Sequence, residues 1–191
     1  MKNNMIDIIC IVGTAGSGKD TILQNVCSHC GEDVVHPIIS YTTRPRRDGE
    51  QDGKDYYFIT ETDFKKMIYN NEMIEYTVFN NWYYGITVNS FSKDKPNIGI
   101  FNPEGIEALR SFTNLRLMIY PITASPKTRL LRQINREINP NIAEICRRFL
   151  ADQKDFDLYE HWAQINETAT DFSDNVFKIC SYIEGLWAES N

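Results

Sequence analysis

A glycine-rich turn stands between an apolar run and a helical pattern near the start of the chain, in the stretch "IDIICIVGTAGSGKDT". Residues 6–12 are apolar apart from one aspartate, which is typical of a buried parallel strand. Gly13, Gly16 and Gly18 follow the strand, and residues 21–30 suit a helix. This order predicts an α/β fold with a tight loop at the end of an interior strand.

The loop has the spacing G-x-x-x-x-G-K of a phosphate-binding loop, or P-loop. Its glycines let backbone N–H groups wrap a phosphate chain, Lys19 reaches the outer phosphates, and the following helix adds the positive end of its dipole. Asp20 replaces the usual Ser or Thr, so we expect the hydroxyl of Thr21 to hold Mg²⁺. A turn that only connects strand and helix is the alternative, which this context disfavours. The expected ATP-binding residues of the loop are Gly13, Thr14, Ala15, Gly16, Ser17, Gly18, Lys19, Asp20 and Thr21.

Strand and helix patterns alternate over most of the remaining chain. The expected strands are residues 34–39, 97–102, 115–122 and 161–166, and the expected helices are residues 103–112, 126–137, 141–159 and 171–187. This alternation predicts a parallel sheet with helices on both faces. Residues 41–95 are instead aromatic and rich in turns, with a short helix at 61–70 and strands at 73–79 and 82–88. We interpret them as an inserted lobe.

Length and composition limit the possible classes of protein. The chain has 191 residues, enough for one domain with a core at residues 1–40 and 97–191 and the lobe at about 41–96. A net charge of −6 argues against binding long nucleic acid through the overall field, so a bound polyanion should be small. The first apolar run is too short to span a membrane and lacks a signal-peptide pattern. Five cysteines without regular spacing fit reduced thiols in the cytoplasm.

The stretch "YTTRPRRDGEQDGKDYYF", residues 41–58, concentrates groups that bind phosphate. Arg44, Arg46 and Arg47 offer forked donors that suit phosphate oxygens, and Tyr56 and Tyr57 add hydroxyl groups. A loop that grips a nucleoside triphosphate needs an acceptor site nearby. We therefore expect this stretch to bind a second, small phosphate ester.

With these two stretches, "NNEMIEYTVFNNWYYG" and the later arginines, the sequence resembles the guanylate kinase family, which phosphorylates GMP with ATP. The resemblance implies a three-layer P-loop fold with an NMP-binding lobe and a helical lid at about residues 132–148. It implies that the phosphate of the acceptor is bound by Ser40, Arg44, Arg47, Tyr56 and Tyr84. It also implies that Glu75 reads the guanine edge, where an ionised carboxylate can accept from two neighbouring N–H donors.

The stretch "RLLRQINREINPNIAEICRRF" carries the arginines of the implied lid. Arg132 and Arg136 lie four apart on one helical face, and Arg147 and Arg148 follow a Pro-containing turn. A solvated basic helix is the alternative interpretation. In the family such arginines neutralise charge on the transferring group, and Asn166 resembles an asparagine near the adenine pocket. The expected catalytic residues are Lys19, Arg44, Arg132, Arg136 and one or both of Arg147 and Arg148.

The sequence also departs from the family. Ile100 and Asn102 occupy the two acidic positions of an Asp-x-Asp segment, and Ile86 replaces a small hydroxyl residue after "YYG". Ile100 cannot help to hold hydrated Mg²⁺, whereas Asn102 can still accept one hydrogen bond from a base. We keep Ile86 and Asn102 in the expected acceptor site, where base selectivity is the most affected property.

The sequence thus predicts an ATP- and Mg²⁺-dependent phosphotransferase that acts on GMP or dGMP, as a monomer or homodimer in the cytoplasm. Two alternatives stay open. One is a kinase of the same fold for another nucleotide or a sugar phosphate, and the other is a non-catalytic interaction module of the same family.

Overall fold

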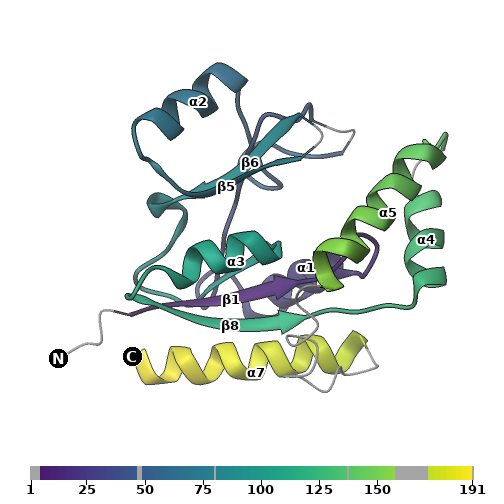
Figure 1. The fold of residues 1–191 in the computed structure, drawn as a ribbon. Helices are drawn as coiled ribbons and strands as arrows, with labels where there is room; N and C mark the ends of the chain where they lie inside the picture. The colour runs from purple at the N-terminus through teal and green to yellow at the C-terminus, as the bar shows by residue number, and fades with distance from the viewer. Residues whose placement is uncertain (1–4, 47–48, 80, 137, 158–171, 191) are drawn as a thin grey trace.

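The structure is a computed structural model that describes residues 5–46, 49–79, 81–136, 138–157 and 172–190 (Figure 1). Its core is a four-stranded sheet in which all neighbouring strands are parallel, which confirms the predicted α/β sheet. In spatial order the strands are β2 (His36–Pro37), β7 (Asn97–Phe101), β1 (Ile6–Val12) and β8 (Leu115–Pro121). The carboxyl ends of β1, β7 and β8 therefore meet at one edge of the sheet.

Strand β1 is buried on both faces, which explains its unbroken apolar sequence. On one face Ile9 packs with helices α1 (Lys19–Cys30) and α7 (Phe172–Ser190). On the other face Ile8 packs with helix α3 (Pro103–Arg110). These helices give the predicted three layers, with α7 and α3 on opposite sides of the sheet in Figure 1.

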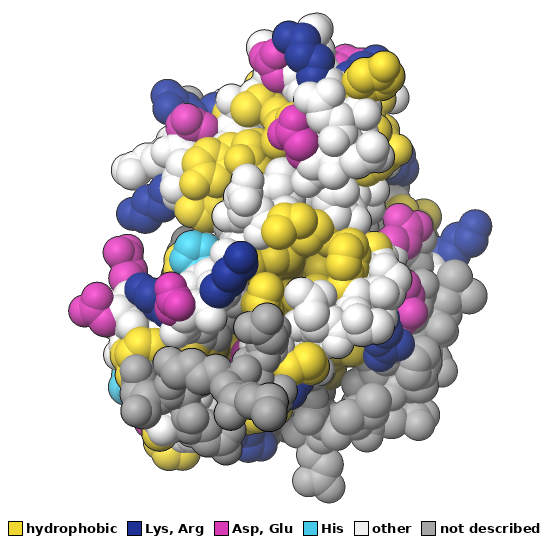
Figure 2. All heavy atoms as spheres, turned by 90° about the vertical axis from the view of Figure 1, so that its left-hand side faces the viewer, with side chains coloured by type: hydrophobic (Ala, Val, Ile, Leu, Met, Phe, Trp, Pro, Cys, Tyr) yellow, Lys and Arg dark blue, Asp and Glu magenta, His cyan; other side chains and the backbone are white. Residues whose placement is uncertain are grey.

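A second sheet forms the lobe, which lies on the α3 side of the core (Figure 1). Its strands, in spatial order, are β4 (Tyr57–Phe58), β3 (Tyr41–Thr42), β6 (Trp82–Thr87) and β5 (Met73–Phe79), followed in the chain by a 3₁₀ turn, η1 (Val88–Ser90). Helix α2 (Glu61–Tyr69) covers this sheet through Phe64, a fully buried side chain whose ring centroid lies 5.2 Å from that of Tyr83. Figure 2 shows hydrophobic side chains, interspersed with charged ones, on the lobe and where the lobe meets the core.

Two further helices, α4 (Pro126–Ile134) and α5 (Ile142–Asp157), contact each other beside the loop that follows β1 (Figure 1). We call them the α4–α5 pair. Helix α4 starts where the hydroxyl of Ser125 accepts from the N–H of Thr128, and Pro126 fits its first turn because that position needs no N–H donor. The pair occupies the region that the sequence assigns to helices at 126–137 and 141–159.

Several boundaries differ from the expected ones. Strand β2 spans two residues of the expected 34–39, because the N–H groups of Val34 and Val35 bond back to the carbonyl of Gly31 and Pro37 has no N–H. Helix α1 begins at Lys19, two residues early. The expected strand at 161–166 lies outside the described residues. No helix in the described ranges is long and apolar enough to cross a membrane.

Asn97, at the start of β7, tests how the strand is fixed. It is fully buried, and its amide nitrogen donates to the carbonyls of Asp7, Ser92 and Lys95. Asn97→Asp turns a carboxylate toward these carbonyls and removes the donor, so we expect the free energy of unfolding in urea at pH 7 to fall by about 3 kcal/mol or more. The matched control is Asn114→Asp at an exposed position, which should change it by less than about 0.5 kcal/mol. Equal losses in both variants would contradict this account.

Candidate functional site

The loop between β1 and α1 is held by close backbone contacts. A Cβ at Gly13 would lie 2.5 Å from the carbonyl oxygen of Ile122, and one at Gly16 would lie 2.6 Å from that of Arg129. Gly16 and Gly18 also have φ angles of 79° and 104°, in the left-handed region. Only glycine fits these positions without strain, and the loop is thereby fixed against the ends of β8 and the start of α4.

Helix α1 begins directly after this loop. Its first residue, Lys19, is one-fifth exposed, with Nζ 3.9 Å from Oδ2 of Asp20. Asp20 and Thr21 are both exposed in the first turn of the helix, whose N–H groups have no partners further back in the helix. The loop thus combines backbone donors, an ammonium group and a helix N-terminus, which together suit a chain of phosphates.

The residues around the loop fit Mg²⁺ only as a partly hydrated ion. In the described parts of the chain no group of three His, Cys, Asp or Glu side chains could hold a metal. Asp20 and Thr21 supply one carboxylate and one hydroxyl in the first turn of α1. This set suits an ion that keeps several waters and takes its other ligands from substrate phosphates.

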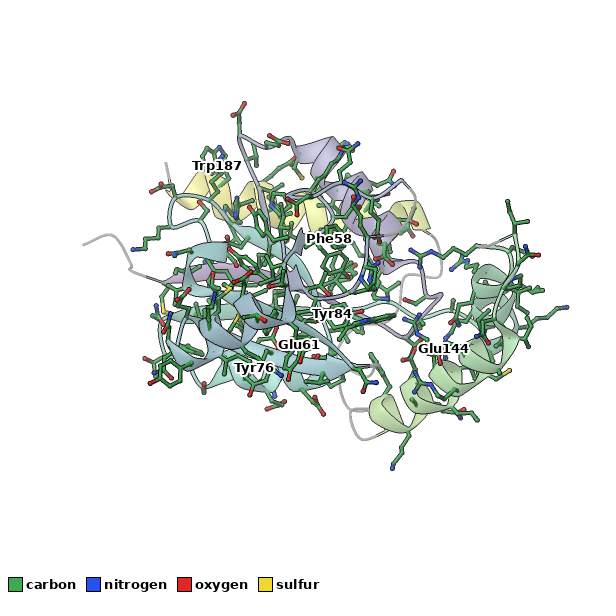
Figure 3. The ribbon with its side chains drawn as sticks, turned by 90° about the horizontal axis from the view of Figure 1, so that it is seen from above. Phe58, Glu61, Tyr76, Tyr84, Glu144 and Trp187 are labelled. Carbon is green, nitrogen blue, oxygen red and sulfur yellow. The ribbon has the colours of Figure 1, made fainter. Side chains whose placement is uncertain are left out.

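The lobe brings together the groups expected to bind the acceptor phosphate. Arg44 is almost fully buried, and its guanidinium donates to Glu50 and to the carbonyl of Pro45, each at 2.7 Å. The same guanidinium lies 5.3 Å from the ring centroid of Tyr56, and the Tyr56 ring lies 6.1 Å from that of Tyr84. Figure 3 shows Tyr84 in the middle of the molecule, with the α4–α5 pair to one side.

Backbone pairing explains this gathering. Strand β3 lies between β4 and β6, so that Thr42 pairs with Tyr84, and the carbonyl of Ser40 accepts from the N–H of Tyr57. Ser40, Arg44, Tyr56 and Tyr84 thus come from three neighbouring segments of one sheet. Arg46 is exposed, and Arg47 lies outside the described residues.

Charges from two parts of the chain act on the hydroxyl of Tyr56. Burial raises the pKa of the Tyr56 hydroxyl, and the negative charge of Asp20 raises this pKa further, whereas Arg44 lowers it. Asp20 lies in the first turn of α1, and Tyr56 belongs to the lobe. Charge at the start of α1 therefore affects a tyrosine that lies beside Arg44.

Glu75 and Asn102 meet at the start of α3. Asn102 caps this helix, because its Oδ1 accepts from the N–H of Gly105 at 2.8 Å. A Cβ at Gly105 would lie 3.0 Å from that Oδ1 and 3.3 Å from Oε2 of Glu75. Burial, and then the charge of Glu104, raises the pKa of Glu75 to about 7. A ligand with two N–H donors would stabilise the charged form of this carboxylate.

The side chains of Ile86 and Ile100 pack in or against the hydrophobic clusters of the core. Ile86 pairs with Glu75 across the lobe sheet, but its side chain is fully buried in the cluster that contains Ile106 of α3. Ile100 is half-buried and packs against the cluster on the α1 side of the core. Ile86 therefore stands behind the expected base site as part of the core, rather than as an exposed side chain.

The expected lid arginines have different surroundings. Arg132 donates to the carbonyls of Gly16 and Ser17 in the P-loop, at 3.1 and 2.9 Å. Arg147 forms two hydrogen bonds with Glu144 on its own helix, at 2.8 and 2.9 Å. Arg136 is exposed after the end of α4, and Arg148 is half-buried. Asn166 lies outside the described residues.

Three residues that the sequence did not single out contact the same loop. Arg129 Nε and Gln133 Nε2 donate to the carbonyl of Ala15, at 3.2 and 3.4 Å, and Oδ2 of Asp152 accepts from the N–H of Ala15 at 2.5 Å. Arg129, Arg132 and Gln133 share one face of α4, and this spacing is the signal that could have identified Arg129 and Gln133. Asp152 lies 137 residues from Ala15 and gave no such signal.

Comparison with known proteins gives a consistent result. The family model "Guanylate kinase" matches residues 5–185. The guanylate kinase of Wigglesworthia glossinidia brevipalpis is 32% identical over 187 residues, covering 96% of this chain and 88% of that protein. That of Prochlorococcus marinus is 31% identical over 183 residues, covering 88% and 95%. The crystal structure of guanylate kinase from Anaplasma phagocytophilum has the same fold, with a TM-score of 0.61, 17% identity, and coverage of 98% and 89%.

The raised pKa of Glu75 predicts a pH-dependent contribution to stability. The folded chain holds this proton up to about pH 7, whereas the ordinary pKa is 4.5, so the carboxyl group costs stability progressively as pH rises between these values. Glu75→Gln removes the charge, and we expect its free energy of unfolding relative to the original chain to increase from pH 5 to pH 8. Urea titrations at both pH values measure this difference. Glu32→Gln, at an exposed position, should show no such trend, and a flat difference for Glu75→Gln would contradict the burial argument.

Proposed function

Since the chain belongs to the guanylate kinase family, we propose that it transfers the γ-phosphate of ATP to GMP or dGMP, giving ADP and GDP or dGDP. The proposal is supported by the close-packed glycine loop that leads into Lys19, together with the gathering of Arg44, Tyr56 and Tyr84 in the lobe. The charge of Asp20, one residue after Lys19, acts on Tyr56 beside Arg44. In this proposal the loop holds the donor phosphates and the lobe residues hold the acceptor phosphate.

Residues of the core would bind and orient the donor. Backbone N–H groups of the loop and the N-terminus of α1 hold the phosphate chain, and Lys19 balances charge at its outer end. Mg²⁺, near Asp20 and Thr21, would supply further positive charge to the outer phosphates when bound. Arg132 already touches the loop, and Arg136, Arg147 and Arg148 reach the donor if the α4–α5 pair closes. Phosphoryl transfer needs little covalent chemistry from the protein, so positioning and charge would carry the rate.

Residues of the lobe would bind the acceptor. Arg44, Tyr56 and Tyr84, with Ser40 and Arg47, hold its phosphate. Glu75 accepts hydrogen bonds from the guanine edge and becomes ionised as it does so. Oδ1 of Asn102 accepts from the N–H of Gly105 and keeps a second lone pair, so this side chain can offer a base both one acceptor and its amide N–H donors.

One further candidate acceptor class is favoured by a specific observation. Asn102, beside Glu75, carries both an acceptor and donors where a carboxylate would only accept, so another nucleotide or small phosphate ester could compete with GMP. The cysteines in the described ranges are all free, which supports a reducing compartment such as the cytosol. We further propose that the chain acts as a monomer or a homodimer.

The proposal is tested by ADP release from ATP and Mg²⁺ with GMP, dGMP, AMP, CMP, UMP or dTMP as acceptor. Lys19→Ala should lower kcat with GMP by about 10²-fold or more with little change in Tm, because charge near the transferring group is lost. Lys93→Ala changes an exposed lysine of the loop before β7 and should leave kcat unchanged. The proposal would be wrong if only an acceptor other than GMP or dGMP is phosphorylated, or if Lys19→Ala keeps full activity.

Tyr84→Phe tests the acceptor site with the loss of a single hydroxyl. We expect KM for GMP to rise about tenfold, because a hydrogen bond to a charged phosphate is lost. The KM for ATP should stay constant, since Tyr84 belongs to the lobe. Tyr69→Phe removes the hydroxyl of an 87% exposed tyrosine on α2 and serves as the control. An equal change in both KM values would count against this assignment.

A further inference from the structure

A carboxylate occupies one of the backbone donors of the P-loop. Oδ2 of Asp152, on α5, accepts from the N–H of Ala15 at 2.5 Å. A short hydrogen bond from a loop amide to a charged oxygen is the type of contact that such loops make with phosphate. The loop is therefore engaged by an anionic group of the chain itself.

Arg129 lies beside this contact and has an unused donor. Its Nε donates to the carbonyl of Ala15 at 3.2 Å, and its Nη2 lies 3.9 Å from Oδ2 of Asp152, beyond hydrogen-bond distance. The side chain is only 10% exposed, and Nη2 is buried without a hydrogen-bond partner among the described residues. A buried guanidinium with an unsatisfied N–H group is costly, so another oxygen ligand would be favoured there.

The position of Arg129 is fixed relative to the loop. Its backbone packs so closely on Gly16 that a Cβ there would lie 2.6 Å from its carbonyl oxygen. Its guanidinium carbon lies 4.5 Å from the ring centroid of Phe149 on α5. Burial lowers the pKa of this guanidinium, and the charge of Asp152 offsets part of that effect. Arg129 and the N–H of Ala15 thus form a small anion site in which Asp152 is the present anion.

We propose that Arg129 is a further phosphate-contacting residue of the donor site, and that Asp152 holds the place of a phosphate oxygen until a nucleotide triphosphate displaces it. This rests on the proposed function, since ATP is the displacing ligand. An outer phosphate carries more negative charge than one carboxylate, so Ala15 N–H and Arg129 would exchange Asp152 for it. The displaced carboxylate frees α5, which also carries Arg147 and Arg148, to rearrange over the donor.

The exchange has a measurable cost in binding. Part of the affinity for ATP is used to break the contact between Asp152 and the loop, whereas a ligand without outer phosphates need not break it. Removing the carboxylate charge should therefore strengthen the binding of ATP and leave the binding of AMP unchanged.

The experiment is calorimetric titration of ATP with Mg²⁺, and of AMP, into the full chain without acceptor. Asp152→Asn should tighten ATP about tenfold, because a competing charge is removed, and should not change the affinity for AMP. Arg129→Gln should weaken ATP about tenfold in the Asp152→Asn background, because there it acts on the phosphate alone. Asp94→Asn, in the exposed loop before β7, removes a carboxylate remote from this contact and is the control. Thermal unfolding of each variant checks that it folds.

Two results would overturn the inference. If Asp152→Asn weakens ATP or leaves its affinity unchanged, the carboxylate does not compete with phosphate. If Arg129→Gln is silent in the Asp152→Asn background, Arg129 serves only as the partner of Asp152. ATP binding and GMP turnover are also measured for the original chain. If the original chain neither binds ATP nor phosphorylates GMP, the proposed function is overturned instead.

Discussion

Close packing of backbone against two loop glycines holds the functional parts of the molecule together. Gly13 lies against the carbonyl of Ile122 at the end of β8, and Gly16 lies against the backbone of Arg129 in α4. Neither contact leaves space for a side chain. The loop, the central sheet and the α4–α5 pair are therefore registered to one another by main-chain atoms, which do not change rotamer. The precision of the proposed donor site would follow from this packing more than from any polar contact.

Charge is compensated locally around the expected phosphate sites. Arg44 pairs with Glu50, Arg147 pairs with Glu144, and Lys19 lies near Asp20. Asp152 plays the same part for Arg129. In a chain with a net charge of −6, the proposed binding of a nucleotide would thus be an exchange of anionic partners rather than the filling of a bare cationic site. Such an exchange makes the rearrangement of side chains a necessary part of binding.

Local patterns made most of the fold predictable, and long-range contacts limited the rest. The sequence of β1 and its loop indicates a strand, a turn and a helix within about sixteen residues. The layered α/β fold could therefore be predicted from this stretch. The strand expected at 34–39 was predicted too long, because a turn at Gly31 takes up the N–H groups of Val34 and Val35. For the site, motifs placed Arg44, Tyr56, Tyr84 and Glu75 on the lobe. The contact of Asp152 with Ala15 could not be predicted, since an acidic residue on an amphipathic helix is typically solvated and only the folded chain brings the two residues together. The sequence likewise did not indicate that Ile86 is buried, because strand residues alternate between a core face and an open face.

The ion pair of Arg44 with Glu50 affects discrimination among the anions of a cell. Glu50 lies 2.7 Å from the guanidinium, and both side chains are largely shielded from solvent. A bare arginine in this position would attract chloride, inorganic phosphate and other abundant ions, which would inhibit the site by simple occupancy. With Glu50 in place, we expect a lone inorganic ion to gain little, whereas a ligand that also engages Tyr84 and the proposed base site would gain enough to bind. The pair would therefore favour ligands that make several contacts over single ions, at the cost of some affinity for every anion.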